Sequence, residues 1–174
     1  IGIQDFEATI SVKALRSDSL NATIRRLAFT EKSGLELKKM GVRLVADNNH
    51  LTINEFTVQF PNTTIGLDNM EVRFDSLQHL PLMTSDVDYK GEIKASLFLP
   101  DFSPIIPQVK GLSNPIRLQT SFRGQGKNID LLDLSLSDNM NLNLQGNASL
   151  SDWDAGRNMY LQAQLTDFSI NHSG

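Results

Sequence analysis

The chain has 174 residues, a formal net charge of −4, no cysteine, and 40% hydrophobic against 21% charged residues. A chain of this length suits one domain, and its apolar share and small net charge exclude an intrinsically disordered protein. The lack of cysteine excludes a disulfide scaffold and a thiolate metal site. The 16 Lys and Arg against 20 Asp and Glu, with no long basic run, argue against nucleic acid as a partner.

Apolar runs in the sequence are short, as in Leu97–Phe98–Leu99, whereas a membrane-spanning helix needs about 20 apolar residues. We therefore expect no helix that crosses a membrane. The first residues do not have the pattern of a signal peptide. Because the chain begins at Ile1 and stops just after an apolar alternation, we interpret residues 1–174 as a single β-segment of a longer protein.

Alternation of apolar and polar residues is the main pattern in the chain, and it is typical of strands that bury one face. The polar positions hold mostly Asn, Gln, Ser, Asp, Lys and Arg, as expected for an antiparallel sheet with one wet face. In chain order, the alternating segments are 6–14, 91–99, 116–122, 140–150 and 159–165.

Residues that favour tight turns separate the alternating segments. Counting from turn to turn predicts roughly ten strands, and short connections between sequential strands indicate an antiparallel meander. The predicted fold class is therefore all-β. The turn segments are 47–49, 61–62, 124–126, 138–139 and 152–156.

The alternation slips by one residue at three places, and a slip inverts every later side chain unless a β-bulge absorbs it. The first interpretation is three bulges that help the sheet to curl. The second is strands that bury both faces for part of their length. The slips lie between Ile24 and Leu27, between Ile53 and Phe56, and between Leu67 and Met70.

One segment departs from the strand pattern. Apolar residues at Phe102, Ile105, Ile106 and Val109 have the spacing of one helix face. With proline near the start and glycine after the end, this spacing predicts a short amphipathic helix near residues 102–110. The helix could cover an open end of the sheet, or it could act as a mobile lid or contact bound lipid.

Catalytic and metal-binding patterns are absent from the sequence. The histidines, His50, His79 and His172, are isolated from one another, and no hydrolase or phosphate-binding motif is present. Two aspartate pairs, 86 with 88 and 152 with 154, lack further oxygen ligands at loop spacing, so we interpret them as solvated strand-edge charges. We therefore expect no enzyme activity, no metal site and no cofactor.

The apolar face is poor in large side chains, with one Trp, two Tyr and nine Phe in the whole chain, the Phe mostly in the first 122 residues. From Leu131 onward it consists almost entirely of Leu, Met, Ala and Gly. Such a surface is smooth and adaptable, as expected of a wall that contacts acyl chains. An ordinary leucine-rich core would give the same composition, so composition leaves both interpretations open.

Several short motifs follow one another in an order that resembles the β-strand region of the TamB and AsmA-like family of bacterial envelope proteins. The family resemblance covers most of the chain and rests on patterning and small motifs. The motifs are Gly34–Leu35–Glu36–Leu37, Phe60–Pro61–Asn62–Thr63–Thr64–Ile65, Met70–Glu71–Val72–Arg73–Phe74, Leu99–Pro100–Asp101–Phe102, and Leu144–Gln145–Gly146–Asn147–Ala148–Ser149–Leu150.

The resemblance implies a parent protein that is anchored in the inner membrane and extends through the periplasm. It implies strands that curl into a long open groove with an apolar interior, often called a β-taco, which conducts phospholipid and supports outer-membrane biogenesis. The implied partners are phospholipid acyl chains and an outer-membrane barrel assembly protein that binds a C-terminal part beyond this segment. The expected groove lining is Ile93, Ala95, Leu97, Leu118, Phe122, Leu134, Leu136, Leu142, Leu144, Leu150, Leu161 and Leu165.

Two other classes of function remain open at this point. The chain could be a structural or adhesive β-domain with a sealed core. It could also be a chaperone-like module whose open sheet edge pairs with a strand of an outer-membrane protein precursor.

Overall fold

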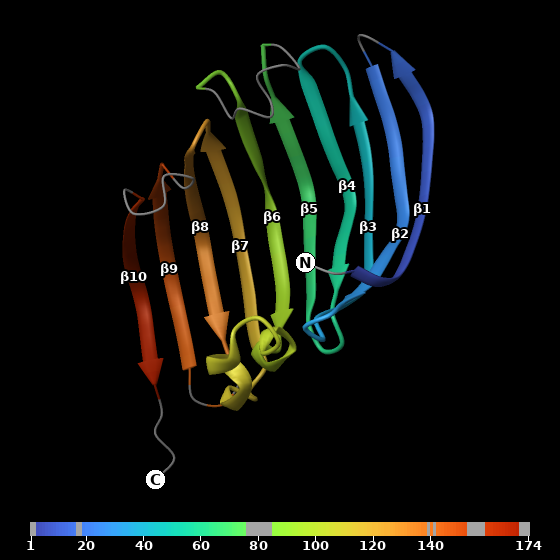
Figure 1. Ribbon diagram of the computed structural model, residues 1–174. Helices are drawn as coiled ribbons and strands as arrows, with labels where there is room; N and C mark the ends of the chain where they lie inside the picture. Colours follow the sequence, from blue (N-terminus) through green and yellow to red (C-terminus); the bar gives the residue numbers. More distant parts are fainter. Residues whose placement is uncertain are drawn as a thin grey trace.

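The computed structural model describes residues 3–16, 19–75, 85–138, 140, 142–152 and 159–170. These residues form ten strands and two short 3₁₀ helices (Figure 1). The strands are β1 (Ile3–Arg16), β2 (Ser19–Glu31), β3 (Glu36–Ala46), β4 (His50–Gln59), β5 (Thr64–Arg73), β6 (Asp88–Leu97), β7 (Ile116–Gln125), β8 (Asn128–Ser137), β9 (Leu142–Ser151) and β10 (Tyr160–Ile170). The 3₁₀ helices are η2 (Leu99–Phe102) and η3 (Pro107–Gly111).

The strands form one sheet in which their order in space is their order in the chain, β1 through β10. Every neighbouring pair is antiparallel. β1 and β10 are the two edges and do not pair with each other, so the sheet is not closed into a barrel. The all-β antiparallel meander predicted from the alternation is confirmed.

Turn chemistry ends the strands where the sequence predicts it. The backbone N–H groups of Asn49 and His50 donate to Asp47 Oδ1 at 3.2 and 2.9 Å, which fixes the β3–β4 turn. Asp138 Oδ1 accepts the backbone N–H groups of Met140 and Leu142 in the same way. Such side-chain bonds compete with the sheet ladder and favour a turn.

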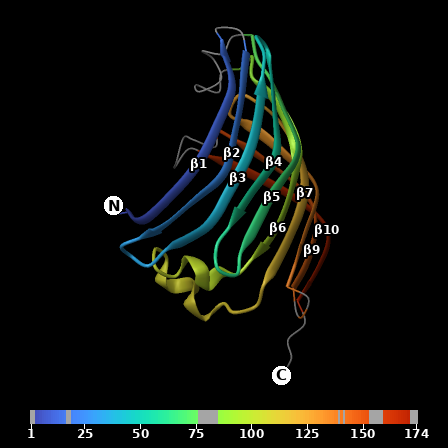
Figure 2. The ribbon, with the colours of Figure 1, turned by 90° about the vertical axis from the view of Figure 1, so that its right-hand side faces the viewer.

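The predicted slips are β-bulges. The pairing of β2 with β3 shifts between Ile24 and Leu27, and shifts also occur where β4 meets β3 and where β5 meets β6. The bulged strands β4 and β5 carry residues with positive φ, 56° at Glu55 and 53° at Asn69. Because the bulges absorb the slips, the apolar residues stay on one face and the interpretation of two buried faces is wrong. Bulges bend strands and increase twist, and Figure 2 shows the strands bent and the sheet curled.

The best-buried part of the structure lies towards the end of the sheet where β5 and β7 finish and β6 begins. Its buried residues are Val72, Phe74, Val87, Tyr89 and Phe122. The chain continues to pair just beyond the strands there, since Phe74 N–H donates to Asn49 O at 3.0 Å and Gly126 N–H donates to Val87 O at 2.8 Å.

The structure does not contain the single amphipathic helix predicted near residues 102–110. Two 3₁₀ helices occupy this region, separated by a turn (Figure 1). In a single α-helix over residues 102–110, Pro107 would have to donate a backbone N–H, and proline has none. The residue before Pro107, Ile106, has φ −123° and ψ 83°, outside the helical region, as expected because proline disfavours the helical conformation of the residue that precedes it.

Candidate functional site

The strand register places the predicted lining residues on one face of the sheet. Residues directly opposite one another on paired strands share a face. One such row runs Ala95, Leu118, Leu136, Leu144 and Phe168 across β6 to β10. Parallel rows contain the remaining predicted residues: Ile93 beside Leu67, Leu97 beside Ile116, Phe122 beside Leu131, Leu142 beside Ile170, Leu150 beside Leu161, and Gly146 between Leu134 and Leu165.

β-Bulges keep the apolar residues on this face at positions where a slip in the alternation would turn them to the other face. In β8 the pairing with β9 shifts between Leu131 and Leu134, at Asp133, whose φ is 51°. In β10 it shifts between Leu165 and Asp167, so Leu165 and Phe168 lie on the same face. Sequence reasoning identified three slips in the first half of the chain and missed these two, although the Leu131-to-Leu134 spacing carries the same signal.

Burial of the apolar face falls from the middle of the sheet to its edges. Phe122 in β7 is 5% exposed, whereas Leu161 in β10 is 62% exposed. Among the described residues, large exposed apolar side chains gather on β1 and β10: Ile3, Phe6, Ile10, Val12, Tyr160, Leu161, Leu165, Phe168 and Ile170. The edge strands therefore carry an apolar surface that the described part of the chain leaves in contact with solvent.

Glycines on this face give room to aromatic rings on the neighbouring strand. Gly91 lies opposite Phe122, and a Cβ at Gly91 would lie 2.8 Å from the ring. Gly124 lies opposite Tyr89 in the same way, and Tyr89 Oη donates to Asn128 O at 2.9 Å. The two rings are 6.4 Å apart. The rings of Phe122 and Tyr89 therefore lie over glycines of the neighbouring strand, so these large side chains rise little above the backbone of the sheet.

The segment that contains the 3₁₀ helices is fastened to the β4–β5 turn. Asp101 accepts hydrogen bonds from the backbone N–H and the side-chain amide of Asn62 at 2.8 and 3.0 Å. The Thr63 side chain is fully buried and bonds both backbone groups of Phe98. The rings of Phe60 and Phe102 meet edge to face at 5.0 Å.

Of the residues predicted for the lid helix, the structure therefore gives Phe102 an anchoring role at the β4–β5 turn. Val109 is half-buried, whereas Ile105 and Ile106 are exposed, at 60% and 49%. The segment lies at the ends of the strands on one side of the sheet (Figure 2). The register and these contacts place it at the border of the apolar face, with two isoleucines available to a ligand or partner.

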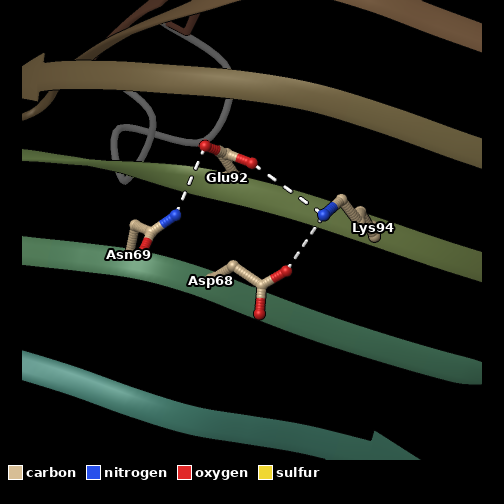
Figure 3. Close-up of polar contacts among 4 residues, drawn as sticks. All are labelled: Asp68, Asn69, Glu92 and Lys94. Atoms are coloured by element: carbon tan, nitrogen blue, oxygen red, sulfur yellow. Dashed lines mark hydrogen bonds and ion pairs between the residues drawn. The ribbon is translucent and has the colours of Figure 1, made fainter.

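The opposite face is polar and carries ion pairs between neighbouring strands. Lys94 Nζ lies 3.2 Å from Asp68 and 4.0 Å from Glu92, and Asn69 donates to Glu92 at 3.4 Å (Figure 3). These side chains are exposed, so each pair contributes little to stability. The polar face holds these charges in solvent.

A hollow of about 470 Å³ lies over β5 to β8. Most of the residues that line it belong to the polar face, among them Glu71, Lys90, Arg123 and Asp130. The Lys90 ammonium hydrogen-bonds Glu71 at 3.1 Å and lowers the pKa of that carboxyl, and Arg123 lies 3.5 Å from Asp130. The sequence did not predict this hollow, because it depends on which residues of four strands stand opposite one another.

Those residues considered for catalysis or metal binding that the structure describes are not brought together into a metal site. In the described part of the chain, no group of three or more His, Asp or Glu side chains is placed to hold a metal ion. His50 begins β4 opposite Arg73. Asp88 lies at the start of β6, opposite Arg73 on β5. His79, His172 and Asp154 lie outside the described residues.

In comparisons with known proteins, no protein-family model, no curated protein and no solved structure matches the chain. Within the described residues, we find no helix of the length and apolar character that a membrane crossing requires.

Proposed function

We propose that the curled sheet is an open groove that holds the acyl chains of phospholipids against its apolar face. The observation that carries this proposal is the continuity of that face. Apolar rows extend from β1 to β10 through the register of every strand pair, and the apolar residues of the edge strands are exposed. A sealed core would bury those residues.

The energetics favour a collective apolar surface over a single tight site. Each CH₂ of an acyl chain that leaves water gains about 0.8 kcal/mol, so two chains of about 16 carbons gain roughly 25 kcal/mol. A smooth wall of Leu, Ala and Gly supplies such contacts at many positions of nearly equal energy. Lipid can then move along the face while its headgroup stays in water at the open side.

The wider proposal follows the resemblance to the TamB and AsmA-like family. In it, the chain is a segment of a periplasmic protein anchored in the inner membrane. The groove conducts phospholipid between the inner and outer membranes and supports outer-membrane biogenesis. An outer-membrane barrel assembly protein would bind a part of the parent beyond this segment. No residue of the segment performs chemistry in this account.

The exposed isoleucines of the 3₁₀ segment fit a role at the lip of the groove. Ile105 and Ile106 lie close to Phe102, which is anchored by Phe60. In the proposal they contact acyl chains that extend past the strand ends. The anchoring hydrogen bonds of Asp101 and Thr63 hold this lip in place.

Native mass spectrometry of the chain incubated with phospholipid tests the proposal. The variant Leu144→Asp places a charge in the middle of an apolar row, and Gln145→Asp places the same charge on the polar face of the same strand. We expect lipid adducts on the wild type and on Gln145→Asp, and a loss of several-fold on Leu144→Asp, with unchanged circular dichroism in all three. Absence of adducts on the wild type, or their equal retention on both variants, would favour a sealed structural domain.

A further inference from the structure

In the central strands β6 and β7, the apolar face is buried at one end and accessible at the other. At the end where β6 begins, Tyr89 is 8% exposed and Phe122 is 5% exposed. At the end where β6 finishes, Leu97 and Ile116 are directly opposite one another and only half-buried. Leu112, just before β7, is 53% exposed. An acyl chain can therefore reach these strands from the end that carries the 3₁₀ helices.

A hollow of about 230 Å³ lies at this accessible end of the sheet. Its lining combines apolar side chains with a hydroxyl and an amide: Leu99, Leu112, Ile116, Leu142, Ser113 and Asn114. Asp138 also lines the hollow, but its carboxylate is engaged, because it accepts the backbone N–H of Leu142 at 2.8 Å and the side-chain amide of Asn114 at 3.5 Å. The hollow lies within the span from β6 to β9, so strands added beyond β1 or β10 would extend the sheet sideways and leave it accessible.

We propose that this hollow is the subsite for the ester-linked glycerol of a phospholipid, the part that joins the acyl chains to the phosphate. The inference rests on the proposed function, because it gives an orientation to lipid that is held on the apolar face. At about 230 Å³ the hollow is smaller than the roughly 300–1,000 Å³ of pockets that hold a whole small ligand, so it takes only this part of the lipid. The Ser113 hydroxyl and the second N–H of the Asn114 amide donate to the ester carbonyls. Lys110, in the last turn of η3 beside the hollow, is exposed and supplies positive charge for the phosphate.

The length of the accessible face matches an acyl chain that lies along the strands. Ile116 at the hollow and the buried Phe122 are both in β7, and six residues of a strand span about 20 Å. The hydrocarbon core of a bilayer is about 30 Å thick, so a chain in one leaflet spans about 15 Å. A chain that starts at the hollow therefore ends near Ile93 of β6, before the ring of Phe122.

Two photoreactive phosphatidylcholines test this orientation. One carries a diazirine at the chain carbon nearest the ester, and the other carries it near the methyl end of the chain. Each is presented to the protein in vesicles, and mass spectrometry identifies the labelled residues. We expect the first lipid to label Leu112, Ile116 and Leu142 several-fold more than the second does. The second should label Ile93 and Leu165 more strongly, because both lie further along the strands from the hollow.

The same pattern from both lipids, or the reverse pattern, would overturn the inference and leave the proposed function standing. No labelling of the apolar face by either lipid would overturn the proposed function and the inference with it.

A pair of variants tests the hollow itself. Leu112→Asp places a charge in its wall, and Val45→Asp is the matched control, because Val45 is an exposed apolar residue on the polar face of β3. We expect labelling of Ile116 by the first lipid to fall several-fold in Leu112→Asp and to stay at the wild-type level in Val45→Asp. Equal labelling of Ile116 in the two variants would overturn the assignment of the hollow.

Discussion

Substitution of Gly146 by alanine tests the close approach of β9 and β10 on which the apolar face at the C-terminal edge depends. Gly146 lies between Leu134 of β8 and Leu165 of β10, and both partner strands are bulged there. A Cβ at Gly146 would overlap the Gln164 carbonyl oxygen and lie 3.0 Å from Leu165 Cα. These are backbone atoms, so β10 itself must move.

We expect Gly146→Ala to destabilise the β9–β10 pairing by about 1–3 kcal/mol, the range for overpacking that shifts backbone. Gly41→Ala is the matched control, because its Cβ would meet the nearest atom, Ile24 O, at an ordinary 3.6 Å. A glycine replaced without strain is neutral or stabilising by about 0.4–1 kcal/mol.

Urea denaturation measures the global effect, and hydrogen exchange of the β10 amides measures the local one. Faster exchange in β10 of Gly146→Ala, with Gly41→Ala close to wild type, is the expected result. Equal effects of the two substitutions, or unchanged β10 exchange in Gly146→Ala, would refute the reasoning from the bulged register.

Two further predictions concern the anchored turn and the polar face. Thr63→Val leaves both backbone groups of Phe98 without their hydroxyl partner. Measured by urea denaturation, it should lower the free energy of unfolding by about 1–3 kcal/mol. An unchanged denaturation midpoint would mean that the 3₁₀ segment is held by other contacts. Glu71 has a pKa lowered from 4.5, chiefly by its hydrogen bond to Lys90. Because its folded pKa is depressed, its stabilising effect is present above the unfolded pKa and is lost as pH falls through the folded value. As the pH falls below about 4.5, the free energy of unfolding of Glu71→Gln should therefore decrease less steeply than that of the wild type. If the plots of unfolding free energy against pH are parallel for the two proteins, the Glu71–Lys90 pair does not couple to folding.

The sequence was sufficient to predict the sheet and its apolar face because both depend on local, period-two patterning. The alternation in β9, from Leu142 to Leu150, directly predicts which residues share a face, and the structure places them as expected. The slip between Ile53 and Phe56 likewise predicts a bulge, because the apolar residues must return to the same face.

The sequence was insufficient where non-local contacts or proline decide the structure. The spacing of Phe102 to Val109 is helical, yet Pro107 prevents the ladder of hydrogen bonds from forming, and the segment is held by Asn62 and Thr63, more than thirty residues away in the chain. The hollow around Lys90 depends on the register of four strands. Such contacts have no signature in a single stretch of sequence.

Photo-crosslinking along β9 tests the central claim most directly. A photoreactive residue is placed in turn at each position from 143 to 150 except Gly146, where a side chain would displace β10, and the chain is incubated with phospholipid vesicles. The groove predicts crosslinks to lipid with period two, at Leu144, Ala148 and Leu150, and background levels at Asn143, Gln145, Asn147 and Ser149. Lipid crosslinks without this period, or none at the apolar positions, would contradict the proposal that the apolar face holds acyl chains.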